Sequence, residues 1–345
     1  MQISSFLDVI NACRFCFMCR HIDTTASVSF RESDIPRGRA LILDRVRMNG
    51  IEELTEHPDF VTTMYDCALS AACRYHCVSH YDETGLILAA RRDVVEAGLA
   101  PADVQALADT LATTPEPVLT GEAGDVLYVE SADQPEVSAA FSQLMARAGV
   151  SYRTLQVGET GKALAVLGYR ALAAQQASKA GDAILASGCG TVVTSCPATF
   201  DALKNDTSEL DGIDVQHSST YLLGLSKEGK LTAGPAARQA YYIDSDFLRN
   251  YNEIMAEPRE LLTASGYALT PFGTNPEESY GLGEGAVVLD RLRPALVHGL
   301  RQRLVELMDS PDALIITASP YTRQILSQWE GDAVRVLSLE EALLA

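Results

Sequence analysis

The sequence predicts an α + α/β protein, in which a helical N-terminal domain is followed by two duplicated α/β lobes. Three observations predict this class. Most of the cysteines lie within the first 77 of the 345 residues, where apolar residues otherwise recur at helical spacing. Short apolar segments then alternate with alanine-rich helical segments, which is typical of parallel α/β layers. Finally, a set of short motifs occurs twice, about 120 residues apart, which indicates one internal duplication.

Residues 1–117 are expected to form the helical domain. The segment 40–54 has apolar residues at helical spacing, and residues 94–98 end a second helix at a glycine. Residues 101–117 have the pattern of a further helix that runs into a proline-containing linker. We therefore place the domain boundary at this linker.

The first lobe is expected to span residues 118–234 and the second lobe residues 235–345. Strands are predicted in the first lobe at 126–130, 152–157, 191–195 and 213–218. Three pairs of segments relate the lobes: 195–199 with 318–322, 159–161 with 279–281, and 215–225 with 334–344. Because each half is too long for a solenoid repeat, the pairs indicate two similar lobes.

The charge balance excludes some classes of partner. Lys and Arg number 27 against 46 Asp and Glu, so the formal net charge is −19. This charge disfavours nucleic acids and anionic membrane surfaces. No run reaches the roughly eighteen apolar residues of a membrane span, and the N-terminus lacks the features of a secretory signal. We expect a cytoplasmic protein, and leave open whether it docks on a membrane complex through a partner.

The cysteine spacing is that of an iron–sulfur protein. Bacterial ferredoxins have the run C-x2-C-x2-C-x3-C, in which the fourth cysteine ligates the other of two clusters. Two copies of this run fit the chain. The first copy has Cys13, Cys16 and Cys19, with Asp23 in the fourth place, and the second has Cys67, Ser70, Cys73 and Cys77. The remaining two cysteines are Cys189 and Cys196.

The crossing of ligands between the copies predicts one complete [4Fe-4S] cluster. Its ligands are the first three cysteines of the first copy and the last cysteine of the second: Cys13, Cys16, Cys19 and Cys77. A second cluster would need Cys67 and Cys73 together with Ser70 and Asp23. Oxygen donors suit iron–sulfur clusters poorly, so this second site is less favoured.

Several alternatives stay open at this stage. Four cysteines also hold structural zinc, although three cysteines at x2 spacing are more typical of a cubane. Cys67 and Cys73 could be buried thiols, remnants of a lost site or a redox disulfide. The sequence does not decide whether Asp23 and Ser70 hold an unusual second cluster. Three arginines adjoin the cysteines and either offset the cluster charge or are solvated: Arg14, Arg20 and Arg74.

Other motifs give weaker signals. The segment YGLGEG at 280–285 lacks the Lys-Ser/Thr of a P-loop, and no flavin or nucleotide is expected in this chain. Glu159, His217, Asp244 and Asp246 offer oxygen and nitrogen donors, but their spacing matches no compact metal motif. No G-x-S-x-G or H-E-x-x-H motif is present.

The motifs together resemble one known family. Residues 31–50, RESDIPRGRALILDRVRMNG, are similar to the SPRGR segment between the cluster motifs of glycolate oxidase iron–sulfur subunits. The corresponding iron–sulfur subunits of anaerobic glycerol-3-phosphate dehydrogenase and of heterodisulfide reductase share that layout. Residues 192–203 and 241–262 resemble later stretches of the same family. The resemblance covers nearly the whole chain and implies a two-cluster ferredoxin-like domain followed by two CCG (cysteine-rich) domains.

The chain departs from this family mainly in its thiolates. The Cys-Cys-Gly positions hold Glu159-Thr160-Gly161 and Ser279-Tyr280-Gly281. The C-P-x-C positions hold Cys196-Pro197-Ala198-Thr199 and Ser319-Pro320-Tyr321-Thr322, and the His-Asp-Pro-Cys run has become Ile243-Asp244-Ser245-Asp246. The second and third domains are therefore expected to be scaffolds, with no catalytic centre in residues 118–345.

The resulting hypothesis is a non-catalytic electron-transfer subunit of an oxidoreductase complex. The resemblance implies a hetero-oligomer with a flavoprotein dehydrogenase or demethylase, and a further electron carrier as second partner. One alternative is a structural or assembly subunit whose metal only stabilises the N-terminal domain. Another is an enzyme with a substrate cleft between the lobes, near Asp244 and Glu159. The substrate, the reduction potential and the direction of electron flow are not predicted.

Overall fold

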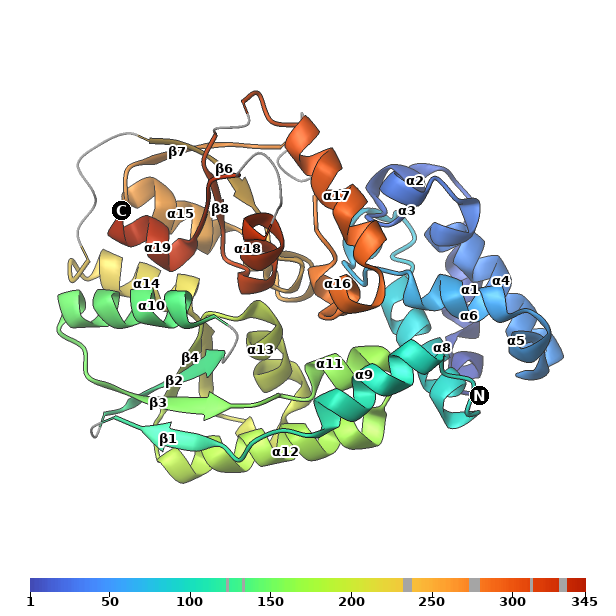
Figure 1. The fold of residues 1–345 in the computed structure, drawn as a ribbon, viewed down its shortest axis with the longest axis horizontal. Coiled ribbons are helices and arrows are strands. Elements are labelled where there is room, and N and C mark those ends of the chain that lie inside the picture. The colour runs from blue at the N-terminus through green and yellow to red at the C-terminus, as the bar shows by residue number, and fades with distance from the viewer. Residues whose placement is uncertain (122–123, 132–133, 232–237, 273–279, 311–312, 329–333) are drawn as a thin grey trace. The chain divides into compact units, whose positions relative to one another are not determined.

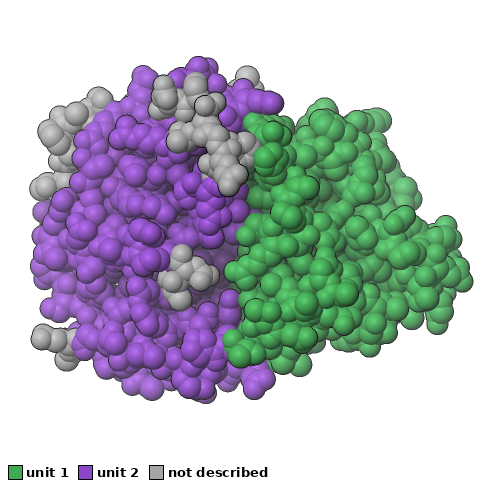
Figure 2. Space-filling model, in the orientation of Figure 1, with its two compact units in different colours: residues 1–113, 161–173, 281–304 green, residues 114–160, 174–280, 305–345 purple. Residues whose placement is uncertain are grey.

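A computed structural model of the chain describes residues 1–345 except 122–123, 132–133, 232–237, 273–279, 311–312 and 329–333 (Figure 1). The residues group into two compact units, which Figure 2 shows in different colours. Unit 1 contains 1–113, 161–173 and 281–304, and unit 2 contains 114–160, 174–280 and 305–345. This grouping differs from the three predicted segments, because both lobes belong to unit 2 and two later segments belong with the N-terminal residues.

Unit 1 is built from helices. They are α1 (Leu7–Ala12), α2 (Met18–Ile22), α3 (Ala26–Ser29), α4 (Pro36–Asn49), α5 (Glu52–Glu56), α6 (Pro58–Tyr65), α7 (Ala72–His76), α8 (Glu83–Glu96), α9 (Ala102–Ala112), α11 (Lys162–Leu167), α16 (Leu289–Leu292) and most of α17 (Pro294–Glu306). The segment predicted as one helix over 40–54 forms α4 and α5. Gly50 separates them with a φ of 106°, which only glycine adopts readily.

The first sheet of unit 2 has the strand order β1-β3-β2-β4-β5. Its strands are β1 (Val118–Thr120), β2 (Val126–Ser131), β3 (Tyr152–Val157), β4 (Thr191–Thr194) and β5 (Asp214–His217), which include the four predicted from sequence. All pairs are parallel except β1 with β3. The helices of this lobe are α10 (Pro135–Ala148), α12 (Arg170–Ser187), α13 (Pro197–Asp201) and α14 (Ser218–Lys227).

The second sheet of unit 2 repeats the order of the first. Its strands β6 (Arg238–Ile243), β7 (Tyr267–Thr270), β8 (Ile315–Thr317) and β9 (Val336–Ser338) lie in the parallel order β7-β6-β8-β9. In the first sheet, β3 lies on one side of β2, and β4 and β5 lie on the other side. In the second sheet, β7 lies on one side of β6, and β8 and β9 lie on the other side. The associated helices are α15 (Ala256–Ala264), α18 (Pro320–Ser327) and α19 (Leu339–Leu344).

Two of the sequence pairs fall at equivalent places in these sheets. The prolines of the first pair begin α13 and α18, directly after β4 and β8. The segments 215–225 and 334–344 each contain a last strand that leads into a helix, β5 to α14 and β9 to α19. In the third pair, Ser279 lies outside the described residues. The shared strand order agrees with one internal duplication.

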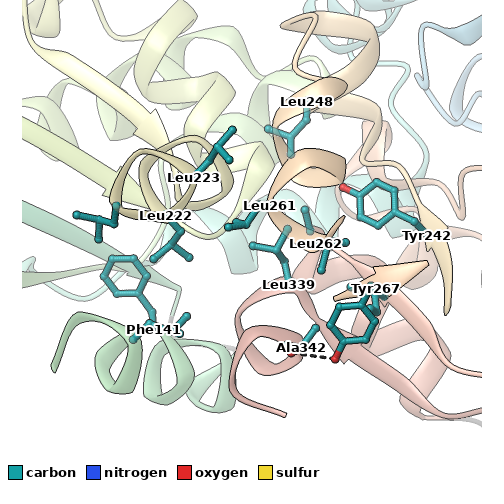
Figure 3. Close-up of a cluster of buried hydrophobic side chains, with 14 of the residues drawn as sticks. Phe141, Leu222, Leu223, Tyr242, Leu248, Leu261, Leu262, Tyr267, Leu339 and Ala342 are labelled. Carbon is teal, nitrogen blue, oxygen red and sulfur yellow. Dashed lines mark hydrogen bonds between the residues drawn. The ribbon is translucent and has the colours of Figure 1, made fainter. Parts of the chain in front are cut away.

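A layer of helices joins the two sheets into one core. Phe141 of α10 and Leu222 of α14 face Leu261 and Leu262 of α15 and Leu339 of α19 (Figure 3). All five side chains are at most 1% exposed. Burying an apolar side chain of this size stabilises the fold by about 1.5–3 kcal/mol. Among the residues that the structure describes, none of the helices combines the length and hydropathy that a bilayer crossing requires.

Candidate metal centre

Four cysteines from two separate loops line one cavity in unit 1. Cys13 directly follows α1, Cys16 lies in the next loop, and Cys19 is in the first turn of α2. Cys77 directly follows α7, in the second cysteine loop. The same cavity is lined by Cys73. The fold therefore brings together the four residues that the crossing of ligands predicted.

Arg37 holds the first cysteine loop. Its guanidinium carbon lies 4.2 Å from the centroid of the Phe17 ring. It also donates long hydrogen bonds to the carbonyl oxygens of Phe15 (3.5 Å) and Cys16 (3.4 Å). Phe15 has a φ of 52°, a left-handed conformation that costs a non-glycine residue about 1–2 kcal/mol. The loop is thus held in a turn that an isolated peptide would rarely adopt.

The PRGR segment explains this arrangement from sequence. Arg37 forms an ion pair with Glu32, which fixes the guanidinium beside the loop. A Cβ atom on Gly38 would collide with the carbonyl oxygen of Glu32, so the start of α4 packs against residue 32 only with glycine at this position. The motif therefore has a packing role as well as a charge.

Burial and mutual repulsion disfavour free thiolates in this cavity. Burial is the main reason that the pKa of Cys13 is raised and that the pKa of Cys19 is raised to about 11. The neighbouring thiols of Cys16 and Cys77 raise the pKa of Cys13 further, because several thiolates in one place repel one another. A metal centre removes both penalties, since thiolate ligands bind as the deprotonated form and their charge is offset by the metal.

The two candidate centres require different spacings of the sulfur atoms. Tetrahedral zinc with Zn–S bonds of about 2.3 Å would bring four sulfurs within about 3.8 Å of one another. Among the described residues, one group of three or more candidate ligands has donor atoms that all lie within 4.8 Å of one another. That group does not consist of these four cysteines. In a cubane each thiolate binds a different iron, so wider spacing is expected. The cubane and the zinc alternative therefore predict different spacings of the sulfur atoms.

The less favoured second site is filled by protein contacts. Asp23 accepts hydrogen bonds from the Ala26 amide (2.7 Å) and from Arg39 (3.2 Å). The Cys73 thiol donates to Glu83, at 2.8 Å, and Arg39 donates to the other oxygen of Glu83 at the same distance. The compact ligand group of the described residues is Asp23, Cys73 and Glu83.

Arg39 changes what this second site can bind. Its side chain is 1% exposed and pairs with both carboxylates, so their negative charge is already offset by a guanidinium. Burial raises the pKa of Cys67 to about 12 and raises that of Cys73 as well, as it does for Cys13 and Cys19. Ser70 accepts a hydrogen bond from Thr24 at 3.3 Å. Both cysteines are free thiols, without the disulfide that the sequence left open.

Glu83 and Arg39 were not identified from sequence as members of this site. Glu83 is at the first position of α8, after the N-cap Asp82, where acidic residues are common for helix-dipole reasons alone. Arg39 is the last residue of the PRGR motif, but the sequence does not show that its side chain is buried. A buried charge becomes recognisable only once its partners are placed around it.

The glycine-rich segment at 280–285 packs against the second cysteine loop. A Cβ atom on Gly285 would collide with the carbonyl oxygen of Leu69. Leu69 and Ala71 have φ angles of 49° and 57°, so this loop also contains left-handed turns at non-glycine residues. This close contact within unit 1 explains why residue 285 is a glycine.

The other candidate residues lie in unit 2 and do not converge as a compact ligand group in the part of the chain that the structure describes. Cys189 and Cys196 lie before and after β4, and Cys189 donates to the carbonyl of Gly124 at 3.3 Å. Glu159 follows β3, while Asp246 is buried just before a π-helical turn at Phe247–Tyr251.

Asp244 borders a cavity of about 420 Å³ at the carboxyl ends of β6 and β7. Its carboxylate accepts two hydrogen bonds from Arg259, at 2.6 and 2.8 Å. Tyr242 and Phe272 form aromatic walls. Because Asp244 is already paired, it offers no free base, and Glu159 is not among the residues that line this cavity.

His217 is buried as a neutral side chain, and this predicts a pH dependence of stability. Burial lowers the pKa of His217 to about 4, and its ring contacts Ser219 (2.9 Å) and the carbonyl oxygen of Ser195 (3.3 Å). In the unfolded chain the pKa is about 6.5, so the unfolded state takes up a proton first as the pH falls. The stability contributed by neutral His217 is complete above about pH 6.5. It decreases by about 2 kcal/mol at pH 5.

The measurement is the free energy of unfolding in urea at pH 7.5 and pH 5, for the wild type and His217→Asn. The wild type should lose about 2 kcal/mol more than the variant between the two pH values. The nearby carboxyl of Glu340, which accepts a hydrogen bond from Ser218, has a pKa raised by burial and favours folding at low pH. That group is present in both proteins and cancels in the difference. Equal pH dependence in both would contradict the assignment.

Comparison with known proteins finds a distant relative. The chain is 24% identical over 324 residues to the EtfAB:quinone oxidoreductase of Syntrophomonas wolfei subsp. wolfei (strain DSM 2245B / Goettingen). The match covers 81% of this chain and 44% of that protein, so the chain spans less than half the length of the relative. No protein-family model matches the chain, and no solved structure matches it significantly. By its name, that relative is an electron-transfer oxidoreductase.

Proposed function

We propose that this chain is an electron-transfer subunit that carries one [4Fe-4S] cluster on Cys13, Cys16, Cys19 and Cys77. The observation that carries the proposal is that these four cysteines, from two loops far apart in sequence, line one cavity. Similarity to an EtfAB:quinone oxidoreductase supports electron transfer as the general activity.

Residues of this chain would hold the cluster and adjust its environment. When bound, the cluster would supply one-electron oxidation and reduction. The backbone of Phe15 lowers the pKa of Cys13 and that of Arg37 lowers the pKa of Cys19, as hydrogen-bond donors that favour the thiolate form would. Hydrogen bonds of this kind raise the potential of a cluster, because they stabilise added negative charge.

The proposed partners are a flavoprotein dehydrogenase or demethylase and a further electron carrier, in a hetero-oligomer. The name of the relative gives EtfAB and a quinone as its reaction partners, which agrees in kind with such a chain of carriers. We also propose that the helical domain is ferredoxin-like and that the two lobes are CCG-type domains that act as scaffold. The matching strand orders of the two sheets support a common origin of the lobes.

The test is the anaerobic iron and acid-labile sulfide content of the purified chain, with EPR spectra before and after dithionite. We expect about four irons and four sulfides per chain and a cubane signal that responds to reduction. About eight irons would mean that the site around Asp23 and Cys73 also holds a cluster. Zinc without sulfide, or a cluster that is never reduced, would contradict electron transfer and favour the structural subunit.

A further inference from the structure

Exposed apolar side chains surround the cavity of the four cysteines. Phe15, Phe17, Met18 and Val78 are 49%, 64%, 53% and 79% exposed, and we call them the apolar rim. Phe15, Met18 and Val78 line the cavity itself, and Phe17 is held beside it by Arg37. Large apolar side chains that are gathered at one place on a surface, with polar residues around them, mark interaction sites.

The charge around the apolar rim is opposite to that of the whole chain. The segments 13–22 and 72–81, which carry the four cysteines, contain no acidic residue, although the net charge of the chain is −19. Arg14 and Arg20 are exposed, and neither forms an ion pair with a described residue. The other basic residues of these segments are His21, Arg74, His76 and His80. Arg74 pairs with Asp82 at 3.4 Å, so the basic charge at the edge of this apolar surface comes mainly from Arg14 and Arg20.

Resting on the proposed function, we infer that the apolar rim with Arg14 and Arg20 is the docking site of a redox protein whose own face has an apolar centre and an acidic edge. Complementary charge steers such partners together and fixes their orientation. An anionic membrane would be repelled by the strongly acidic remainder of the chain. Cys16 is exposed between Phe15 and Phe17, so a partner docked here lies directly against the cluster ligands.

The rim side chains are suitable for substitution because they contribute little to the core. A charge variant, Arg14→Glu with Arg20→Glu, reverses the edge, and Val78→Ser removes the most exposed member of the rim. Matched controls make the same changes elsewhere: Arg147→Glu with Arg170→Glu, and Phe30→Ser at a side chain that is 78% exposed. All variants are prepared as the full chain with its cluster under anaerobic conditions.

The experiment is stopped-flow reduction of the cluster by flavodoxin hydroquinone, an acidic one-electron donor, at several salt concentrations. For the wild type, the second-order rate constant should fall as salt rises. The charge variant should react at least about tenfold more slowly and lose most of this salt dependence, and Val78→Ser should react several-fold more slowly. The controls should stay within about twofold of the wild type.

Photoreduced 5-deazariboflavin, a small neutral donor, separates this inference from the proposed function. It should reduce the cluster to the same extent in every variant, including those at Arg14, Arg20 and Val78 beside the ligands. If it reduces none of them, the proposed electron transfer itself fails. The docking site is wrong in either of two cases, provided that deazariboflavin reduces all variants. One is that the charge variant and its control react with flavodoxin at equal rates. The other is that the wild-type rate constant does not change with salt concentration. The inference would also be overturned if the wild type, but not the charge variant, floated with phosphatidylglycerol vesicles, which would indicate a membrane as the partner. Dimerisation of the wild type that the charge variant lacks would indicate a second copy of this chain instead.

Discussion

Replacing Cys77 by serine is expected to remove the cluster. Cys77 is the predicted ligand from the second cysteine loop, whereas the other three lie within seven residues of one another in the first. Without it, one iron has no thiolate, and a serine oxygen is a poor substitute. Iron content should fall from about four per chain to below about one, with loss of visible absorbance. Because ligand binding is coupled to folding, the unfolding temperature of unit 1 should also fall.

The matched control for this substitution is Cys67→Ala. Cys67 is 5% exposed and belongs to the same run of cysteines, but it does not line the four-cysteine cavity, and its main electrostatic contact is with Arg39. Iron and sulfide should stay within about a tenth of the wild-type content, since no cluster ligand is lost. A full cluster in Cys77→Ser, or its loss in Cys67→Ala, would show that the ligands have been assigned wrongly.

Replacing Arg39 by methionine is expected to destabilise the protein by about 3–5 kcal/mol. The substitution removes the cation that pairs with Asp23 at 3.2 Å and Glu83 at 2.8 Å, and leaves two buried carboxylates without a counter-charge. Since typical domains have a total stability of about 5–15 kcal/mol, this is a large fraction. The measurement is the free energy of unfolding from urea titrations at neutral pH.

Two further variants separate the charge from the packing of Arg39. Adding Asp23→Asn and Glu83→Gln to Arg39→Met should restore most of the lost stability, because no unpaired charge then remains buried. Arg47→Met is the control. Arg47 is partly exposed and pairs with Asp44 in the same helix, and its loss should cost less than about 1 kcal/mol. If the triple variant is no more stable than Arg39→Met alone, the ion network does not account for the role of Arg39.

Local patterns predicted the elements of the fold better than their grouping. The strands of the first lobe were predicted because β-branched and apolar residues alternate with turns, and this information is local. The break between α4 and α5 was missed because the apolar spacing continues across Gly50, and only the backbone angle shows the interruption. The assignment of 161–173 and 281–304 to unit 1 depends on contacts between distant segments, such as Gly285 with Leu69, which no local pattern contains.

Sequence patterns also predicted only part of the candidate site. The four cysteines that the ferredoxin spacing selects line one cavity together with Cys73, and their role as ligands stays a prediction. This spacing did not predict Arg39 and Glu83 in the second site, since charged residues in a helix are usually solvated. The exposed aromatic residues beside the cysteines were also missed, because sequence alone does not distinguish a core phenylalanine from an exposed one.

The helical layer between the two sheets has a consequence for how this chain can be divided. Leu222 belongs to the first lobe and Leu262 to the second, and each is 0% exposed in a core to which both lobes contribute. Either lobe produced alone would present its leucines to water and would tend to aggregate rather than fold. The two lobes are therefore expected to depend on each other for stability, and they should melt together in a single transition.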